Sequence, residues 1–387
     1  MSELDQLVIS TRPGMFASIS QAYIPPLSPS LHYSHSLFEG MSIIYRDGKA
    51  GLFHPTLNLE RLRYNVEELG WKWMGYSDAD IIGNIFALTA MNGFYKSFRE
   101  GSGVSIKKAG REIKRLYVRP LVYTNSNAIG LGSEMKPELL LAVAPMGHYL
   151  PEKKQGIDVM LFPYPRIVSF PGLKTASGYQ IAIYAKAKTN LFNLKSERQC
   201  PETIFTNKEG YVVEGSGENI FMLSEGKLVT PLPSDGALPG ITIRIVSYVA
   251  EQLGIDCEFG KMTLEDIGKS DGIFLTGNAA GIVPVNAIAE VDKSYELKRW
   301  HELGSGANET IRKIKDEYEK LETWQGSERF HTFMEDWYLQ DEIIELEGMF
   351  SEGRKQAEYT PPCRIPEKFK IDSLWINEKF SMRNYLS

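Results

Sequence analysis

Two adjacent stretches of the sequence have the pattern of β-hairpins, and they constrain the fold more than any other feature. TIFTNKEGYVVEGS (203–216) and NIFMLSEGKLVTP (219–231) each place a glycine turn between alternating apolar and polar residues. The next stretch, LPGITIRIVSYVAEQLG (238–254), predicts a helix that begins after a Pro-Gly turn and ends at a glycine. A strand-rich core flanked by helices is therefore expected in this part of the chain.

The N-terminal part of the chain mixes helix and strand patterns. After His54, TLNLERLRYNVEELG has leucine and valine at helical spacing, and Gly70 stands at the position of a C-cap. RLYVRPLVYT and ELLLAVAP are rich in Val, Leu and Tyr and predict strands. Further on, Ser177 and Gln180 have the spacing of a capping box before a helix that is expected to run to about Leu194.

A polar segment with glycine and proline, GHYLPEKKQG, indicates a boundary between two domains. The expected class is α/β, of the α+β type. We expect a small α+β domain at 1–147, a linker at 148–156, a larger strand-rich domain at 157–326 and a C-terminal extension at 327–387. No chemistry can be attached to the extension.

Composition excludes several classes of partner. The formal charge of -6, from 43 basic and 49 acidic side chains, argues against binding to nucleic acid. The 3 cysteines have no CxxC spacing, so a reducing, cytoplasmic setting fits better than a disulfide framework. The N-terminus lacks the pattern of a signal peptide, and no run approaches the roughly 20 apolar residues of a membrane span. We therefore expect no membrane partner.

Several short motifs admit both a chemical and a structural interpretation. GSG (215–217) is a weak phosphate motif, because strand-like residues follow it instead of a helix. LPGIT (238–242) suits an anion at a helix N-terminus, but an ordinary turn before a core helix explains it equally well. Lys174, near glycine at a strand-to-helix junction, suits a Schiff base, although most lysines are solvated. The HxxH of His32 and His35 lacks a third ligand, so no metal is expected.

The order of these motifs resembles that of the class IV, branched-chain-type aminotransferases, which are pyridoxal-phosphate enzymes of fold type IV. The resemblance covers roughly residues 20–326 and is carried by HYSHSLFEG, NLERLRYN, RLYVRPLVY, GLKTASGY, VVEGSGENIF, LPGIT and FLTGNAAGIVPV. It implies a two-domain fold type IV architecture, pyridoxal 5'-phosphate as cofactor, amino acid and 2-oxo acid substrates, and a homodimer.

The resemblance also implies roles for individual residues at the cofactor. Lys174 would bind the cofactor covalently and, once released by substrate, move a proton at the substrate Cα. Glu214 would face the pyridine nitrogen and keep it protonated, and Tyr179 would hydrogen-bond the ring hydroxyl. The other matches belong to the phosphate site: Arg61, Ile241, Thr242 and Asn278.

On the substrate side, Tyr117 and Arg119 match the tyrosine and arginine of a strand that helps receive carboxylates. Ala279, together with its neighbour Asn278, would add backbone N–H donors. Tyr33 and Phe38 match aromatic residues that form the wall of the side-chain pocket, and ordinary core packing explains these two equally well.

Three departures from the family pattern leave the substrate range open. Ser42 replaces a residue that is commonly basic, so a charge near the substrate pocket is expected to be missing. Ile243 stands where an arginine usually follows LPGIT, and Arg244 would point about 100° away on a helix. Asn278 replaces a threonine, although its amide can still donate to a phosphate.

The expected function is therefore a pyridoxal-phosphate aminotransferase acting on an L-amino acid, branched-chain or otherwise hydrophobic, and a 2-oxo acid. Two alternatives remain open. The first is a lyase on the same fold, similar to the aminodeoxychorismate lyases, and the altered Ser42, Ile243 and Asn278 motivate it. The second is a metabolite-binding homologue without catalysis, which the retention of Lys174 and Glu214 argues against.

Overall fold

The described residues of this chain form two compact units. The computed structural model describes residues 7–101, 115–132, 135–146, 150, 156–167, 170, 172–325, 327–349 and 356–359. The first unit takes its residues from 1–147, 174–177 and 322–371, and the second takes most of its residues from 148–173 and 178–321. Of the segment 148–156 that was expected as a linker, only Leu150 and Gly156 lie within the described residues.

An antiparallel sheet forms the centre of the first unit. Its strands run in the order β17-β5-β4-β6-β7-β1-β2-β18, and the short β3 also pairs with β6. Among the described residues, seven strands of this sheet come from the N-terminal part of the chain, before the second unit begins: β1 (Val8–Arg12), β2 (Met15–Ser18), β3 (Leu37–Phe38), β4 (Met41–Arg46), β5 (Lys49–Phe53), β6 (Arg115–Thr124) and β7 (Pro137–Pro145).

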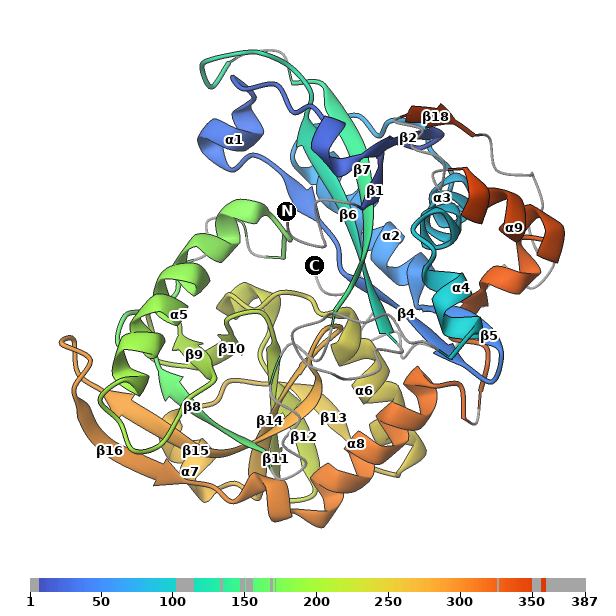
Figure 1. The fold of residues 1–387 in the computed structure, drawn as a ribbon. Helices are drawn as coiled ribbons and strands as arrows, with labels where there is room; N and C mark the ends of the chain where they lie inside the picture. Colours follow the sequence, from blue (N-terminus) through green and yellow to red (C-terminus); the bar gives the residue numbers. More distant parts are fainter. Residues whose placement is uncertain are drawn as a thin grey trace. The chain divides into compact units, whose positions relative to one another are not determined.

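Helices cover one side of this sheet (Figure 1). They are α2 (Pro55–Glu68), α3 (Asp78–Met91), α4 (Phe94–Arg99) and α9 (Gln340–Gly348), while the short α1 (Pro29–Tyr33) precedes β3. Helix α2 follows its predicted pattern, because Leu59, Leu62 and Val66 are buried and Gly70 takes the left-handed φ of 73° after the helix ends. A capping box of Ser77 and Asp80 starts α3, whose apolar residues are buried nearly all round.

The C-terminal extension supplies strands to both edges of the same sheet. β17 (His331–Phe333) pairs antiparallel with β5 at one edge, and β18 (Gln356–Glu358) pairs antiparallel with β2 at the other. Between these strands, α9 packs against α3, with Ile343 and Leu346 buried in the core (Figure 1). The described part of the predicted extension is therefore built into the first unit, and residues 360–387 lie outside the described residues.

The second unit contains a sheet that closes on itself. Its strands run β10-β9-β8-β15-β14-β11-β12-β13, and a further pairing of β10 with β11 closes a ring of six strands. Strand β8 is parallel to both β9 and β15. The strands are β8 (Ile157–Leu161), β9 (Glu202–Thr206), β10 (Val212–Gly215), β11 (Asn219–Ser224), β12 (Lys227–Thr230), β13 (Cys257–Phe259), β14 (Gly272–Gly277), β15 (Gly281–Val291) and β16 (Leu297–Glu302), which pairs with β15.

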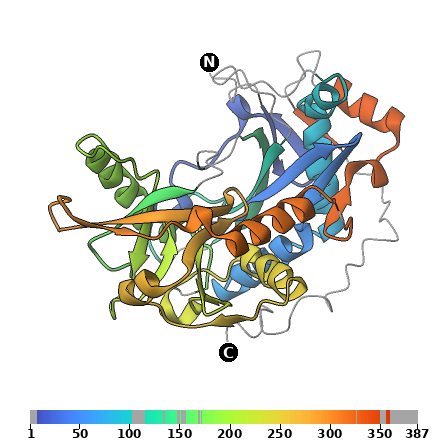
Figure 2. The same ribbon diagram turned by 90° about the horizontal axis from the view of Figure 1, so that it is seen from below.

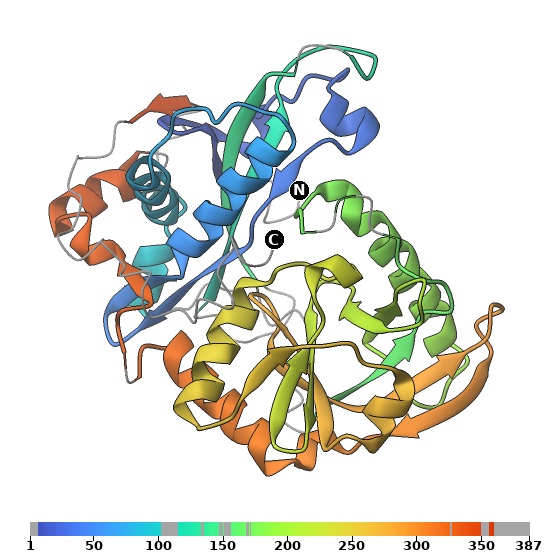
Figure 3. The same cartoon turned by 180° about the vertical axis from the view of Figure 1, so that it is seen from behind.

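Helices surround this closed sheet: α5 (Gln180–Asn193), α6 (Ile241–Gln252), α7 (Leu264–Lys269) and α8 (Glu309–Glu322). Helices α6 and α8 lie side by side, and α5 lies on the opposite side of the sheet (Figures 1, 2 and 3). Both predicted hairpins are confirmed as β9–β10 and β11–β12, and the helix predicted after LPG is confirmed as α6. The α+β expectation is therefore confirmed in both units.

The predicted capping box of Ser177 and Gln180 is wrong. The Ser177 hydroxyl lies 3.0 Å from the Thr175 hydroxyl, and a 3₁₀ turn, Ala176–Tyr179, leads into α5 without a side-chain cap. None of the helices in the described ranges has the length and apolar character that a membrane span requires.

Candidate functional site

Lys174 lies beside Phe38 because the short segment that carries it pairs with β3. The Phe38 N–H donates to the Lys174 carbonyl at 3.5 Å, and the Ala176 N–H donates to the Ser36 carbonyl at 2.9 Å. The Nζ atom of Lys174 is 5.0 Å from the centre of the Phe38 ring, within the range of a cation–π contact. The fold thus brings a lysine and an aromatic ring together from distant parts of the sequence.

Strand β6 adds Tyr117 and Arg119 to this cluster. Residues alternate along the strand, so that Leu116 and Val118 are fully buried in the core while Tyr117 and Arg119 point to the opposite face. Arg119 Nη2 donates to the Tyr117 hydroxyl at 2.6 Å, and the Arg119 guanidinium lies 4.2 Å from the centre of the Phe38 ring. The ring of Phe38 is therefore in contact with two cations.

Gly40 is needed where β4 passes Tyr117. A Cβ atom at Gly40 would overlap the Tyr117 hydroxyl, so only glycine fits there without a shift of the tyrosine. The glycine of the FEG stretch therefore has a steric role in positioning the tyrosine.

Arg61, which was expected at a phosphate, makes a bidentate ion pair inside the first unit. Its Nε and Nη2 atoms donate to the two oxygens of Glu39 at 2.6 and 2.8 Å, and Asn58 Nδ2 donates to the same carboxylate at 2.8 Å. All three side chains are buried. Two donors of the guanidinium are thus directed at Glu39, which fixes its orientation. A part for Arg61 in a phosphate site remains a prediction.

A positive charge lies at Ser42, where one was expected to be missing. Arg115 donates to the Ser42 hydroxyl from Nε at 3.1 Å and from Nη2 at 2.8 Å, and Nη2 is also 3.0 Å from a carboxylate oxygen of Glu322. Ser42 pairs with Tyr117 across β4 and β6, and Arg115 precedes Tyr117 by two residues on the same face of β6. The expectation of a missing charge overlooked this neighbouring strand.

The remaining aromatic and histidine candidates of the first unit lie apart from the Phe38 cluster in their described contacts. Tyr33 is 42% exposed, and its hydroxyl accepts a hydrogen bond from the Gly130 N–H at 3.3 Å. His32 Nε2 lies 3.0 Å from the Pro26 carbonyl, whereas the ring of His35 contacts Trp71 edge-on. Among the described residues, no group of three or more His, Cys, Asp or Glu is arranged to hold a metal.

In the second unit, Glu214 is a buried carboxylate with a cation at one oxygen and a backbone donor at the other. Arg166 Nη2 lies 2.6 Å from Oε1, and the Leu238 N–H donates to Oε2 at 2.7 Å. The backbone N–H of Arg166 donates to the Thr206 carbonyl at 2.7 Å, which holds this residue in place. This ion pair and this hydrogen bond favour the charged form of the carboxylate.

The N-terminus of α6 lies next to the hairpin that carries Glu214. Gly240 is the N-cap residue, and no side chain caps the helix. A Cβ atom at Gly240 would overlap Oδ1 of Asn219, whose amide donates to the Leu238 carbonyl at 2.7 Å. The Thr242 hydroxyl donates to Oδ1 of Asn278 at 3.0 Å, which links the helix to the turn between β14 and β15.

The other predicted residues of the second unit lie in turns and in the first turn of α6. Tyr179 ends the 3₁₀ turn before α5, and Ala279 lies in the turn between β14 and β15. Ile241 is the first residue of α6 and is buried. Ile243 and Arg244 are both buried in α6 as well.

Sequence reasoning missed Arg115 and Arg166. Arg115 has a signal, because RLYVR places arginines two residues before and after Tyr117, on one face of a strand. Arg166 has only a weak signal, a single cation after a buried strand in a proline-rich exit, PYPR. Its partner, Glu214, lies far along the chain on β10, so spacing gives no indication of the ion pair.

Comparisons with known proteins identify the family of this chain. The family model described as Amino-transferase class IV matches residues 36–288. The probable branched-chain-amino-acid aminotransferase of Staphylococcus aureus (strain N315) is 26% identical over 307 residues, which cover 76% of this chain and 79% of that protein. The branched-chain-amino-acid aminotransferase of Salmonella typhimurium is 27% identical over 278 residues, which cover 69% of this chain and 80% of that protein.

Solved structures extend the likeness to the fold. The branched-chain aminotransferase of Thermoproteus uzoniensis, solved with norvaline, superposes with a TM-score of 0.66 at 26% identity and covers 85% of this chain and 99% of that chain. The branched-chain amino acid aminotransferase from Escherichia coli superposes with a TM-score of 0.62 at 22% identity, over 82% and 94% of the two chains. The predicted fold type IV architecture is confirmed, and the chain belongs to the amino-transferase class IV family.

Proposed function

We propose that this protein is a pyridoxal-phosphate-dependent aminotransferase that moves an amino group between an L-amino acid with a branched or other hydrophobic side chain and a 2-oxo acid. The cluster at Phe38 carries the proposal: the Lys174 amine and the Arg119 guanidinium contact one aromatic ring. An amine for covalent chemistry beside a receptor for carboxylates suits an amino-acid substrate. The branched-chain names of the relatives support the choice of hydrophobic side chains.

The chemistry of the residues present fits pyridoxal 5'-phosphate. Its phosphate needs N–H donors, and α6 begins at Ile241 and Thr242 without a capping side chain. Its ring nitrogen needs a carboxylate, which the ion-paired Glu214 provides. Its aldehyde needs an amine, which Lys174 provides, and Tyr179 suits its ring hydroxyl.

Each group of this chain then has a task. When bound, the cofactor supplies an electron sink for the pair that the substrate Cα releases. Lys174 Nζ takes the proton from that Cα and later returns a proton. Tyr117 accepts a hydrogen bond from Arg119, so its own hydroxyl proton is directed onward and can donate to a substrate carboxylate. Arg166 keeps Glu214 ionised.

The test compares Lys174→Ala with Lys208→Ala, which changes an exposed lysine of the β9–β10 turn. Absorbance of the cofactor-loaded protein is recorded with a panel of L- and D-amino acids, and turnover is measured with a 2-oxo acid acceptor. Lys208→Ala should behave as wild type, whereas Lys174→Ala should lose both the spectral change and turnover. Turnover by Lys174→Ala would exclude Lys174 as the catalytic amine.

The same experiment separates the two alternatives. A lyase would release pyruvate or ammonia without any oxo-acid acceptor. A metabolite-binding homologue would show no spectral change with any amino acid. In either of these cases the aminotransferase proposal fails.

We also infer a homodimer in a reducing, cytoplasmic setting. Support for the dimer comes from a patch of exposed apolar side chains around α1 and the loop after β6, comprising Leu27, Leu31, Tyr33, Ile129 and Leu131. The buried free thiol of Cys200 is consistent with a reducing compartment. Sedimentation of wild type and Leu131→Asp tests the assembly: the variant should shift toward monomer, and a monomeric wild type would refute the dimer.

A further inference from the structure

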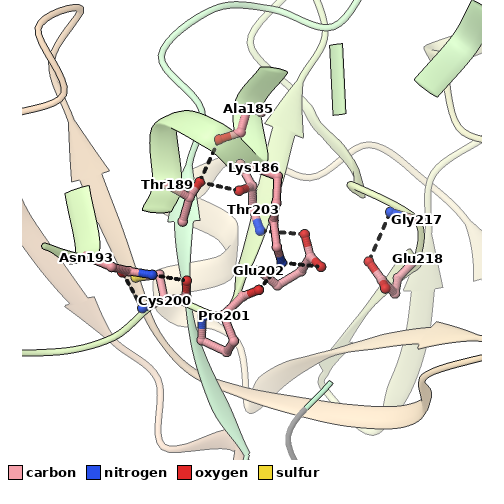
Figure 4. A network of polar contacts seen from close by, with 10 residues as sticks. All are labelled: Ala185, Lys186, Thr189, Asn193, Cys200, Pro201, Glu202, Thr203, Gly217 and Glu218. Atoms are coloured by element: carbon pink, nitrogen blue, oxygen red, sulfur yellow. Dashed lines mark hydrogen bonds and ion pairs between the residues drawn. The ribbon is translucent and has the colours of Figure 1, made fainter. Parts of the chain in front are cut away.

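Glu218 is a buried carboxyl group four residues after Glu214, and the proposed mechanism gives it no task. It directly follows the turn that connects β10 to β11, and its carbonyl accepts the Gly215 N–H at 2.7 Å. Its Oε2 accepts the Gly217 N–H at 3.1 Å. In Figure 4 its carboxyl group and that of Glu202 point toward one another, with Lys186 on the Glu202 side.

Three buried carboxyl groups lie close to one another here, and the two nearby cations described in the structure pair with the other two, not with Glu218. Glu202, Glu214 and Glu218 are 0%, 3% and 4% exposed. Lys186 Nζ lies 3.3 Å from Glu202, and Arg166 lies 2.6 Å from Glu214. Within the described ranges, no lysine, arginine or histidine forms an ion pair with Glu218. A third negative charge in this buried group would be uncompensated, which is costly.

The electrostatic surroundings point the same way. Burial is the largest cause that raises the pKa of Glu218 well above its usual range, and the charges of Glu202 and Glu214 raise it further. The Gly217 N–H and the charge of Lys186 lower the pKa, but they do not cancel the rise.

Gly215 of EGSGEN and Gly277 of β14 border the slot that holds this side chain. A Cβ atom at Gly215 would lie 2.9 Å from Glu218 Oε2 and 3.4 Å from its Cβ, so a side chain there would displace the carboxyl group. A Cβ atom at Gly277 would lie 3.8 Å from Glu218 Cγ. Glu218 therefore packs between the strand end that carries Glu214 and the strand end that leads into Asn278.

We propose that Glu218 is a positioning residue, kept as the neutral carboxylic acid, that fixes the turn after Glu214 and leaves Glu214 as the ionised carboxylate at the cofactor ring. The part about the cofactor rests on the proposed function. The neutral acid accepts the Gly217 N–H without adding a third negative charge to the buried group of Glu202, Glu214 and Glu218. It therefore occupies the slot without weakening the ion pair of Glu214 with Arg166.

The test compares Glu218→Gln, Glu218→Ala and the control Glu225→Gln, which makes the same change at an exposed turn between β11 and β12. Infrared difference spectra, wild type minus Glu218→Gln at neutral pH, should show the carbonyl band of a protonated carboxylic acid. The Glu225→Gln difference should lack it. Absence of the band in the Glu218→Gln difference would overturn the proposal, because Glu218 would then be ionised.

Cofactor binding and kinetics give a second readout. Glutamine has the shape of the neutral acid, so Glu218→Gln should keep the cofactor affinity and the pH profile of kcat/KM. Glu218→Ala leaves the Gly217 N–H without its acceptor and should bind the cofactor about tenfold more weakly. A Glu218→Gln variant as weak as Glu218→Ala would contradict the neutral form. If wild type shows the infrared band but turns over no amino acid, the proposed function fails while the protonation of Glu218 stands.

Discussion

Acid should destabilise the first unit through His331, the first residue of the edge strand β17. The ring of His331 is 8% exposed and stacks on Phe53, with ring centres 4.9 Å apart. Its Nε2 lies 2.9 Å from the Glu322 carbonyl, which can only accept, so Nε2 carries the proton of the neutral ring. Burial lowers the pKa of His331 from 6.5 to about 4. Protonation at Nδ1 would place a charge among aromatic rings.

The sign and the size of the effect follow from this lowered pKa. As the pH falls below 6.5, the unfolded chain binds a proton at this position before the folded protein does, so the free energy of unfolding decreases. The decrease ends near pH 4, where the folded ring also becomes charged. Over this window the loss amounts to about 3 kcal/mol, and the contribution is complete above pH 6.5.

Urea unfolding of wild type and His331→Gln between pH 7.5 and pH 4.5 measures this loss. Glutamine can still donate to the Glu322 carbonyl but does not titrate, so wild type should lose about 2 to 3 kcal/mol relative to the variant as the pH falls. Fluorescence of Trp324, whose ring centre is 5.2 Å from that of His331, reports on the region. His32→Gln, at an exposed position, is the control. Parallel stability curves for wild type and His331→Gln would refute the reasoning.

Two further predictions concern the cations that the motifs did not reveal. Arg166→Gln leaves the carboxylate of Glu214 buried without its cation, which costs about 3 to 5 kcal/mol in comparable pairs, so cofactor affinity followed by absorbance should fall at least tenfold. An unchanged affinity would show that the ion pair is unimportant for the cofactor. Glu322→Gln removes the carboxylate that faces Arg115, so kcat/KM for a dicarboxylic amino donor should rise about fivefold relative to that for leucine. Equal changes for both donors would place Arg115 outside the substrate site.

Local features were predictable because short stretches of sequence determine them. Gly70 ends α2, and Gly226 takes a left-handed φ of 75° in the β11–β12 turn, because only a few residues tolerate these conformations. The helical spacing of Leu59 and Leu62 identified the buried face of α2. The capping box at Ser177 failed for a physical reason: the Thr175 hydroxyl is a competing partner, and the chain forms a 3₁₀ turn at this point.

Long-range contacts were beyond the reach of spacing. Phe38 and Lys174 meet only because residues 174–176 pair with β3, and nothing in either stretch predicts that pairing. The positive charge beside Ser42 belongs to Arg115 on the neighbouring strand β6. Comparing Ser42 alone with the family pattern therefore could not predict it. The resemblance to class IV aminotransferases indicated the candidate residues. Which of these side chains contact one another depends on the pairing between strands, which the sequence pattern does not show.

The two edge strands of the extension have a consequence for any shortened form of the protein. Ending the chain at residue 326 would keep Lys174, Glu214 and the other residues proposed to bind the cofactor, yet it would uncover the N–H and C=O groups of β5 and β2. Open edges of this kind pair readily with strands of other molecules. The fragment would carry all the residues proposed for catalysis and would still be prone to aggregate, because β17 and β18 would no longer cover the two edges of the sheet.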